Sequence, residues 1–250
     1  MAGFMDILVG TSGFAYKEWR GPFYPEKMKE KDMLRYYAER LGTVEINNTF
    51  YRLPGREMLL RWADEVPAGF AFVLKASQRI THRQRLSAES KETVDYLFDV
   101  ASALGGKLGP VLFQTPPFLR RDIGRLRDFL GFLPAGRPVA FEFRHETWRD
   151  DEVYATLKSA NAALVCADTE ESGEAGAPIV PTADWGYLRL RRCDYDDAGL
   201  AAWAARIRAQ PWRKAFVFFK HDEGDAAGMA LKLLSALASI PSRGQPLHSR

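Results

Sequence analysis

Short apolar runs alternate along the chain with longer stretches in which apolar residues recur every three or four positions. The short runs are typical of buried strands, and the longer stretches are typical of amphipathic helices. Gly and Pro residues mark the junctions, as Gly42 does before one run and Pro116 after another. Eight runs predict strands, near residues 7–9, 43–47, 70–74, 111–113, 139–143, 163–167, 187–191 and 215–219.

Each predicted strand is followed by a helical or long crossover segment. This order calls for parallel strands, because every crossover returns the chain to the same edge of the sheet. Eight such units in 250 residues predict an α/β fold, a single-domain (β/α)8 TIM-type barrel. A doubly wound open sheet is the rival, but residues 10–13 lack the glycine spacing of its phosphate-binding turn. We expect one domain over residues 1–242 and a frayed tail over residues 243–250.

The strand near residues 43–47 has one polar face and continues into a polar and aromatic turn. Val44 and Ile46 alternate with Glu45 and Asn47, so the apolar and polar pairs take opposite faces. A similar layout recurs over residues 139–145. Two strands thus each direct a carboxylate and a second polar group from their last residues, and we interpret them as two sides of one site.

Polar residues stand at or just past the end of every predicted strand. Barrel enzymes take their active groups from these carboxyl-terminal ends. Any one of these residues can instead cap a helix or pair with a neighbour, but the whole set favours a ligand site. The candidate catalytic residues are Glu45, Glu142 and Asp168, and the candidate ligand-binding residues at strand ends are Thr11, Ser12, Asn47, Lys75, Gln114, Arg144, Arg189, Lys220 and His221.

Cations outnumber carboxylates in this set, with five Lys or Arg side chains against three carboxylates once Arg191 is included. Arg189 and Arg191 share a strand face with Tyr187 and can point into the barrel, where they need anionic partners. Those partners are Glu45 and Glu142, a bound phosphate or carboxylate, or both. We favour carboxylates clamped by arginine over an acid and base pair that face each other across a cavity. The predicted partner is therefore a small anionic ligand.

Two loops add further candidates. An aromatic loop over residues 14–24 supplies Tyr16 and Trp19, either as a lid or stacking platform or as a satellite hydrophobic cluster. A basic loop over residues 79–85 supplies His82. Aromatic side chains near such a basic loop could stack nucleic-acid bases, so nucleic acid stays open as an alternative partner.

The composition is ordinary for a globular protein, with 46% apolar residues, 27% charged residues and a net charge of +3. No run of about 18 apolar residues predicts a membrane span, and the first residues show no secretory signal. Cys166 and Cys193 have no nearby cysteine partner, so we expect free thiols and a cytoplasmic location. His82, His145 and His221 lack the spacing of a metal motif, so we expect neither a metal nor another cofactor. A monomer is the expected oligomeric state.

Several motifs along the chain are recognisable together. They comprise residues 10–13, 16–19, 23–25, 36–38, 43–51, 72–75, 81–82, 112–114, 141–144 with Trp148, Asp168, 187–189 and 218–221. On these motifs nearly the whole chain resembles the YecE-like family, a domain of unknown function family numbered 72. The resemblance implies a TIM barrel with no established activity, and it adds Trp148 to the candidate ligand-binding residues.

The family also has a distant likeness to endonuclease IV and xylose-isomerase-like barrels, whose metal clusters need more histidines than this sequence has. Many members continue with His-Gly where residues 191–193 stand here. Our leading hypothesis is a cytoplasmic barrel that binds a small anionic or phosphorylated ligand at its mouth, with hydrolase or isomerase chemistry. The alternatives are a nuclease-like or nucleic-acid-binding barrel and a non-enzymatic binding module.

Overall fold

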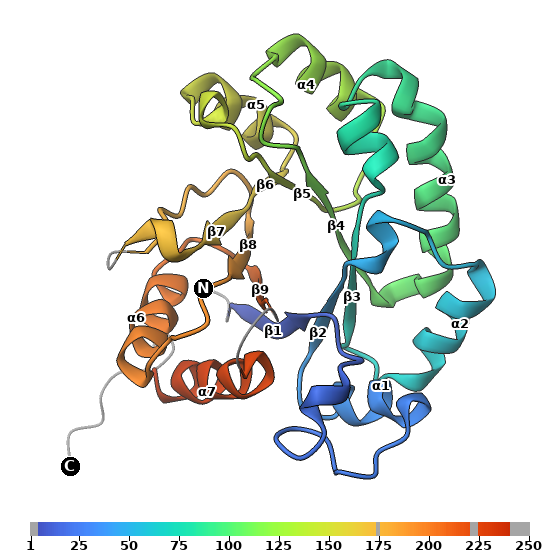
Figure 1. The fold of residues 1–250 in the computed structure, drawn as a ribbon. Helices are drawn as coiled ribbons and strands as arrows, with labels where there is room; N and C mark the ends of the chain where they lie inside the picture. Colours follow the sequence, from blue (N-terminus) through green and yellow to red (C-terminus); the bar gives the residue numbers. More distant parts are fainter. Residues whose placement is uncertain (1–4, 174–175, 221–224, 241–250) are drawn as a thin grey trace.

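The computed structural model of the protein describes residues 5–173, 176–220 and 225–240. Its strands form one parallel sheet in the order β6-β5-β4-β3-β2-β1-β9-β8-β7, which curves into a barrel with the helices outside (Figure 1). The strands are β1 (Asp6–Ser12), β2 (Thr43–Ile46), β3 (Ala71–Lys75), β4 (Leu108–Gln114), β5 (Val139–Glu142), β6 (Ala163–Leu164), β7 (Cys166–Asp168), β8 (Trp185–Leu190) and β9 (Lys214–Phe219).

A ninth strand appears because the sixth predicted strand is divided at Val165. β6 pairs with β5, whereas β7 pairs with β8. The Val165 N–H donates to the Phe141 carbonyl at 2.9 Å, so the chain changes its pairing partner within one residue. The two pieces together occupy the place of one barrel strand, and the predicted TIM-type barrel is confirmed.

Seven α-helices surround the barrel within the described residues. Aspartates cap the last four by accepting backbone N–H groups, which satisfies donors that a helix start leaves unpaired. Within the described ranges, no helix has the length and apolar character needed to cross a membrane. The helices are α1 (Glu30–Ala38), α2 (Arg56–Glu65), α3 (Lys91–Ala101), α4 (Ile123–Gly131), α5 (Asp151–Ser159), α6 (Asp197–Arg208) and α7 (Ala226–Ser239).

Two segments outside these helices were expected to be loops, and only one of them is mostly loop. The basic segment expected as a loop contains a helical turn over Arg79–Arg83. The segment between β7 and β8 was expected as loop, and its only helical piece in the described residues is the short turn Glu170–Ser172. The tail predicted over residues 243–250 lies outside the described residues.

Alternate residues of each strand contribute to separate apolar layers. On β3, Phe72 packs in the layer between the sheet and the helices, whereas Val73 packs in the barrel interior. On β2, Val44 belongs to the outer layer and Glu45 is fully buried on the inner side. A strand covered on both faces normally has apolar residues on both. A charged residue in the interior therefore indicates a polar network there.

β1 and β2 approach each other too closely for any side chain at Gly10. A Cβ atom at Gly10 would lie 1.8 Å from the Thr43 carbonyl oxygen. The Tyr37 hydroxyl of α1 accepts the Thr11 N–H at 2.8 Å and donates to the Thr43 carbonyl at 2.9 Å. This contact fixes the register at the point where both strands approach the barrel mouth.

Candidate functional site

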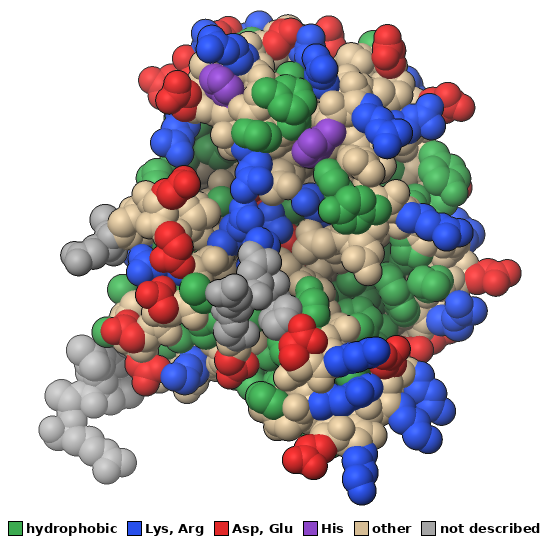
Figure 2. Space-filling model, viewed as in Figure 1, with side chains coloured by type: hydrophobic (Ala, Val, Ile, Leu, Met, Phe, Trp, Pro, Cys, Tyr) green, Lys and Arg blue, Asp and Glu red, His purple; other side chains and the backbone are tan. Residues whose placement is uncertain are grey.

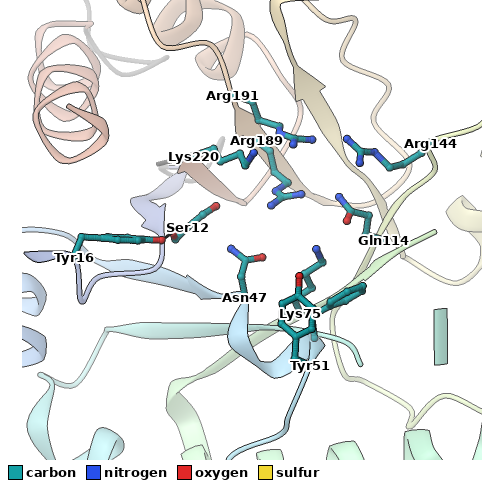
Figure 3. Close-up of a pocket in the computed structure, with 11 residues that line it drawn as sticks. Ser12, Tyr16, Asn47, Tyr51, Lys75, Gln114, Arg144, Arg189, Arg191 and Lys220 are labelled. Atoms are coloured by element: carbon teal, nitrogen blue, oxygen red, sulfur yellow. Dashed lines mark hydrogen bonds between the residues drawn. The ribbon is translucent and has the colours of Figure 1, made fainter. Parts of the chain in front are cut away.

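A cavity of about 340 Å³ opens at the carboxyl ends of the strands (Figure 3). On the face shown in Figure 2, Lys and Arg side chains gather near the centre, around this opening. Because strand ends from around the ring contribute to it, the cavity brings together residues far apart in the sequence. Its lining residues are Ser12, Tyr16, Asn47, Phe50, Tyr51, Lys75, Gln114, Arg144, Arg189, Arg191 and Lys220.

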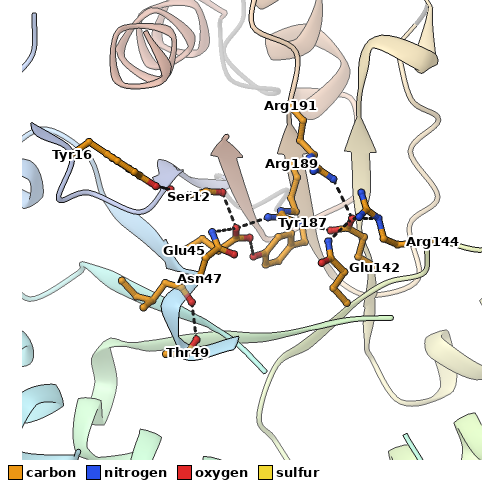
Figure 4. A network of polar contacts seen from close by, with 12 residues as sticks. Ser12, Tyr16, Glu45, Asn47, Thr49, Glu142, Arg144, Tyr187, Arg189 and Arg191 are labelled. Atoms are coloured by element: carbon orange, nitrogen blue, oxygen red, sulfur yellow. Dashed lines mark hydrogen bonds and ion pairs between the residues drawn. The ribbon is translucent and has the colours of Figure 1, made fainter. Parts of the chain in front are cut away.

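Glu45 lies at the floor of the cavity and accepts four hydrogen bonds (Figure 4). One carboxylate oxygen accepts from the Ser12 hydroxyl at 2.7 Å, the Asn47 amide at 3.1 Å and the Arg189 guanidinium at 2.8 Å. The other accepts from the Tyr187 hydroxyl at 2.5 Å. Burial raises the Tyr187 pKa, and the neighbouring Glu45 charge raises it further, so this phenol stays a donor. Two of the four donors, Tyr187 and Arg189, lie on β8, so the carboxylate links β2 to β8.

Glu142 is the second carboxylate bound by the same arginine. It accepts from the Arg189 Nη1 at 2.6 Å and from the Gln114 amide at 2.8 Å. Burial acts to raise the Glu142 pKa, but the charge and hydrogen bond of Arg189 outweigh burial and lower this pKa to about 2. Glu142 is therefore an anion at neutral pH.

Arg189 thus joins two strands that lie across the barrel from each other. The side chain is only 4% exposed, and its charge is matched by Glu45 and Glu142. Burial acts to lower its pKa, but the two carboxylates raise it further. Its buried Nε has no hydrogen-bond partner among the described residues. The geometry is the clamped arrangement that we favoured, and an acid and base pair facing across empty space is not formed.

Two further arginines flank Glu142 at longer distances. Arg144 Nε lies 3.7 Å and Arg191 Nη1 lies 3.6 Å from the same carboxylate oxygen. The Arg144 side chain is 39% exposed, so it lies at the rim of the cavity. Both guanidinium groups point toward the cavity (Figure 3), and both ion pairs are longer than those of Arg189.

Lys75 is the last residue of β3 and extends into the cavity. Its ammonium lies 4.4 Å from the centre of the Phe50 ring, and no hydrogen bond or ion pair reaches it from the described residues. Burial lowers its pKa to about 8, and the Arg189 charge lowers it in the same direction. The Thr49 hydroxyl lies 2.7 Å from the Lys75 carbonyl, which holds the turn bearing Phe50 against β3.

His82 lies beside this part of the cavity without lining it. Its ring centre is 5.0 Å from that of Phe50, and its Nδ1 is 2.9 Å from the Thr81 hydroxyl. Burial lowers the His82 pKa, and the charges of Lys75 and Arg144 lower it further. The imidazole is therefore neutral at pH 7.

Four candidates that the structure describes have other surroundings. Thr11 turns outward to the Tyr37 hydroxyl, and Asp168 accepts the Ala177 N–H at 2.8 Å and the Tyr195 hydroxyl at 2.6 Å. The other two, Trp19 and Trp148, are buried in apolar clusters. None of the four lines the cavity, and each has a packing or hydrogen-bonding role where it lies. His221 lies outside the described residues.

The aromatic loop divides between the apolar core and the cavity. Trp19, Phe23 and Tyr24 are buried and pack with one another and with Tyr36 of α1, as part of the main outer core rather than as a separate satellite cluster. Tyr16 instead lines the cavity and donates from its hydroxyl to the Ser12 carbonyl at 2.5 Å.

Phe50 and Tyr51 line the cavity but were not among the site candidates, and Arg191, which was counted among the strand-end cations, was not named as a ligand-binding residue. Phe50 and Tyr51 belong to the turn that directly follows β2, so their proximity to Glu45 and Asn47 was the available signal. Arg191 lies one residue past the end of β8, and its alternation with Arg189 indicated the same side.

Metal ligands are not grouped in the part of the chain that the structure describes. No three His, Cys, Asp or Glu side chains there lie together as a metal site. Cys166 is buried, and burial raises its pKa to about 12, so its thiol stays protonated. The chemistry of the described cavity comes from guanidinium, ammonium, amide and hydroxyl groups.

The fold and this cavity define a TIM-type barrel with a basic cavity at the carboxyl ends of its strands. The model of the family described as "Protein of unknown function DUF72" matches residues 8–248, so the chain belongs to that family. The resemblance noted in the sequence is thereby confirmed.

Two curated relatives share this sequence pattern. The chain is 26% identical over 230 residues to the UPF0759 protein YunF of Bacillus subtilis. This match covers 87% of this chain and 79% of the relative. It is 32% identical over 113 residues to the UPF0759 protein YecE of Escherichia coli K12. This match covers 45% of this chain and 41% of the relative. Neither name states an activity.

Solved structures agree on the fold. DUF72 family proteins from Enterococcus faecalis and Thermotoga maritima match with TM-scores of 0.78 and 0.76, at 19% and 24% identity. These matches cover 98% and 94% of this chain and 100% of each solved chain. A xylose isomerase-like TIM barrel/4-hydroxyphenylpyruvate dioxygenase fusion protein matches with a TM-score of 0.53 at 15% identity, over 94% of this chain and 42% of that chain. At these identities the likeness concerns the fold alone.

Proposed function

We propose that this barrel binds a small anionic ligand, with a phosphate or carboxylate group, at the mouth cavity. The observation that supports it most is the charge of the described lining and floor. Five cations surround the cavity, while its two carboxylates, Glu45 and Glu142, are both bound to Arg189. Guanidinium groups suit such ligands because their parallel N–H groups match phosphate and carboxylate oxygens.

Hydrolase or isomerase chemistry remains part of the proposal, but the structure limits which residues could act as its acid or base. Glu142 is held ionised by Arg189, so it is not poised to exchange protons with a ligand, and the Glu45 carboxylate is already occupied by four hydrogen-bond donors. Asp168 is engaged outside the cavity. Among the described lining residues, Lys75 is the group that we expect to act on a bound ligand, because its pKa is lowered to about 8. A non-enzymatic binding module remains the alternative if Lys75 does not act.

The size of the cavity favours a small ligand over a polymer. Its volume of about 340 Å³ is at the lower end of small-molecule sites, which are about 300–1,000 Å³. Nucleic-acid binding would instead depend steeply on salt, because each neutralised phosphate releases counterions. The cytoplasmic location expected from the cysteines and the monomeric state stay predictions.

The direct test is the melting temperature in inorganic phosphate or sulfate. A ligand at ten times its Kd adds about 1.4 kcal/mol of stability, and for a chain of this size that is a rise of about 3–5 °C. Arg144→Gln should remove most of this rise, because Arg144 lines the cavity at its rim and has a single long ion pair. Arg189→Ala is unsuited to this test, because it would strand two buried carboxylates at a cost of about 3–5 kcal/mol.

The matched control is Arg127→Gln on α4, where the arginine pairs at the surface with Glu152. It removes the same charge far from the cavity and should keep the full response. Equal responses in all three proteins would mean that the anion binds elsewhere or acts as a general salt. No response in the wild type would rule out the anion site.

A further inference from the structure

Lys75 is placed differently from the other cations of the cavity. The arginines that contact Glu142 and Glu45 are held in ion pairs, whereas the Lys75 ammonium lies over the Phe50 ring and has no hydrogen bond or ion pair among the described residues. Figure 3 shows its ammonium group directed toward the middle of the cavity, facing Arg189. A lysine that only balanced charge would be expected to contact one of the two carboxylates.

The surroundings of Lys75 favour its neutral amine. It is partly buried against Phe50, and Arg189 repels the charged form. Glu45 and Glu142 act to raise the Lys75 pKa, but burial and the arginine charges outweigh them. With a pKa of about 8, about one molecule in ten has the free amine at pH 7, against about three in ten thousand for an ordinary lysine. Desolvation beside another cation is a recognised way to activate a lysine nucleophile.

The cavity also has the means to hold a substrate against this amine. Arg144 lies at the rim, and Arg189 forms the floor opposite Lys75 (Figure 3). A phosphate or carboxylate bound by these arginines would leave the rest of a small molecule beside the Lys75 Nζ. Binding of this kind raises the local concentration of the reacting group, which strongly favours addition.

We propose that Lys75 forms an imine with the carbonyl carbon of a small ketone that bears a phosphate or carboxylate group. The amine nitrogen forms a bond to the carbonyl carbon, and its two protons leave with the carbonyl oxygen as one molecule of water. The overall step, ketone plus amine to imine plus water, needs no oxidant and no cofactor. This inference rests on the proposed function, because the arginine site must hold the anionic group.

The test is reductive trapping on the intact protein. Dihydroxyacetone phosphate and pyruvate are the phosphate and carboxylate probes. Dihydroxyacetone, which lacks only the phosphate of the first probe, is the neutral control. Sodium cyanoborohydride reduces an imine to a stable amine, so the protein gains the mass of the probe less one oxygen atom. Peptide mapping then locates the adduct. We expect Lys75 to be modified by at least one anionic probe, with about tenfold less adduct from dihydroxyacetone.

Two variants complete the design. Lys75→Arg keeps the positive charge but has no amine that can form an imine, so it should lose the adduct. Lys91→Arg replaces an exposed lysine that pairs with Asp95 and should leave adduct formation unchanged. The rate of trapping should rise from pH 6 to pH 8 and level off above, because the free amine is the reacting form.

The outcomes separate the two proposals. A phosphate response without any adduct at Lys75 would overturn the imine and leave the anion site intact. Equal adducts from dihydroxyacetone, or adducts spread over surface lysines, would overturn the imine as a site-directed reaction. Absence of both the phosphate response and the adduct would overturn both.

Discussion

Arg189 is the residue on which the charges of the barrel interior depend. A buried guanidinium is costly to desolvate, and its attraction to two carboxylates offsets that cost only when the remaining donors and acceptors are satisfied. Ser12, Asn47 and Tyr187 satisfy Glu45, and Gln114 satisfies Glu142. Removal of one member would therefore leave its buried partners without a hydrogen bond or ion pair to offset their desolvation.

This dependence predicts the behaviour of the protein in acid. The folded-state pKa of Glu142 is about 2, below the ordinary value of 4.5, so its ionisation stabilises the fold above pH 4.5. This contribution, about 3 kcal/mol, is lost as the pH falls from about 4.5 to 2. Glu142→Gln should be less stable at pH 7 and should show a shallower fall in unfolding free energy over that range. Denaturant titrations at several pH values measure both effects, and an unchanged slope would contradict this role.

At the residue scale, the sequence allowed part of the cluster to be predicted. Alternation with apolar neighbours placed Glu45, Glu142 and Arg189 on the inner side, and the excess of cations favoured clamped carboxylates. The hydrogen bonds of Ser12 and Tyr187 could not be predicted, because they depend on the register between strands that are far apart in the chain. A side chain's rotamer and partner follow from that register.

At the scale of elements, the direction of a residue mattered more than its place at a strand end. Thr11 and Asp168 are strand-end residues, but they share faces with Val9 and Cys166, which pack in the outer layer. The same alternation that placed Glu45 inside therefore placed these two outside. The strand boundaries were predictable from apolar runs, whereas the division of the sixth strand was not, because nothing local to Val165 interrupts its apolar run.

The contact between β1 and β2 gives a prediction at this scale. Gly10→Ala should lower the unfolding free energy by about 1–3 kcal/mol or more, because its Cβ would collide with the Thr43 backbone. Gly131→Ala at the end of α4 is the control, since nothing lies within 4 Å of its Cβ position. The control should be neutral or slightly stabilising, because alanine favours a helix over glycine. Equal stability of the two variants in thermal and denaturant unfolding would contradict the close contact.

For the molecule as a whole, the sequence predicted the barrel and the end at which the cavity lies. The repeated strand and helix pattern determines the ring, and the ring brings the strand ends together whatever their separation in sequence. The ligand could not be predicted this way. The charges supported the proposal of an anion, but the shape of the cavity and the state of Lys75 emerge only when β3, β5 and β8 are assembled.

The division of the sixth strand at Val165 has a consequence for the dynamics of the barrel. Only two residue pairs join β5 to β6 and three join β7 to β8, whereas six join β1 to β9. The ring should therefore open first along this line, and native-state hydrogen exchange should be faster at the Val165 amide than at Val9. Arg144 follows β5 and Arg189 lies on β8, so the two residues stand on opposite sides of the divided strand. An anion held between them would therefore hold the two sides together. Phosphate should then slow exchange at Val165 more than at Val9, and an equal effect at both amides would show that binding does not bridge the opening.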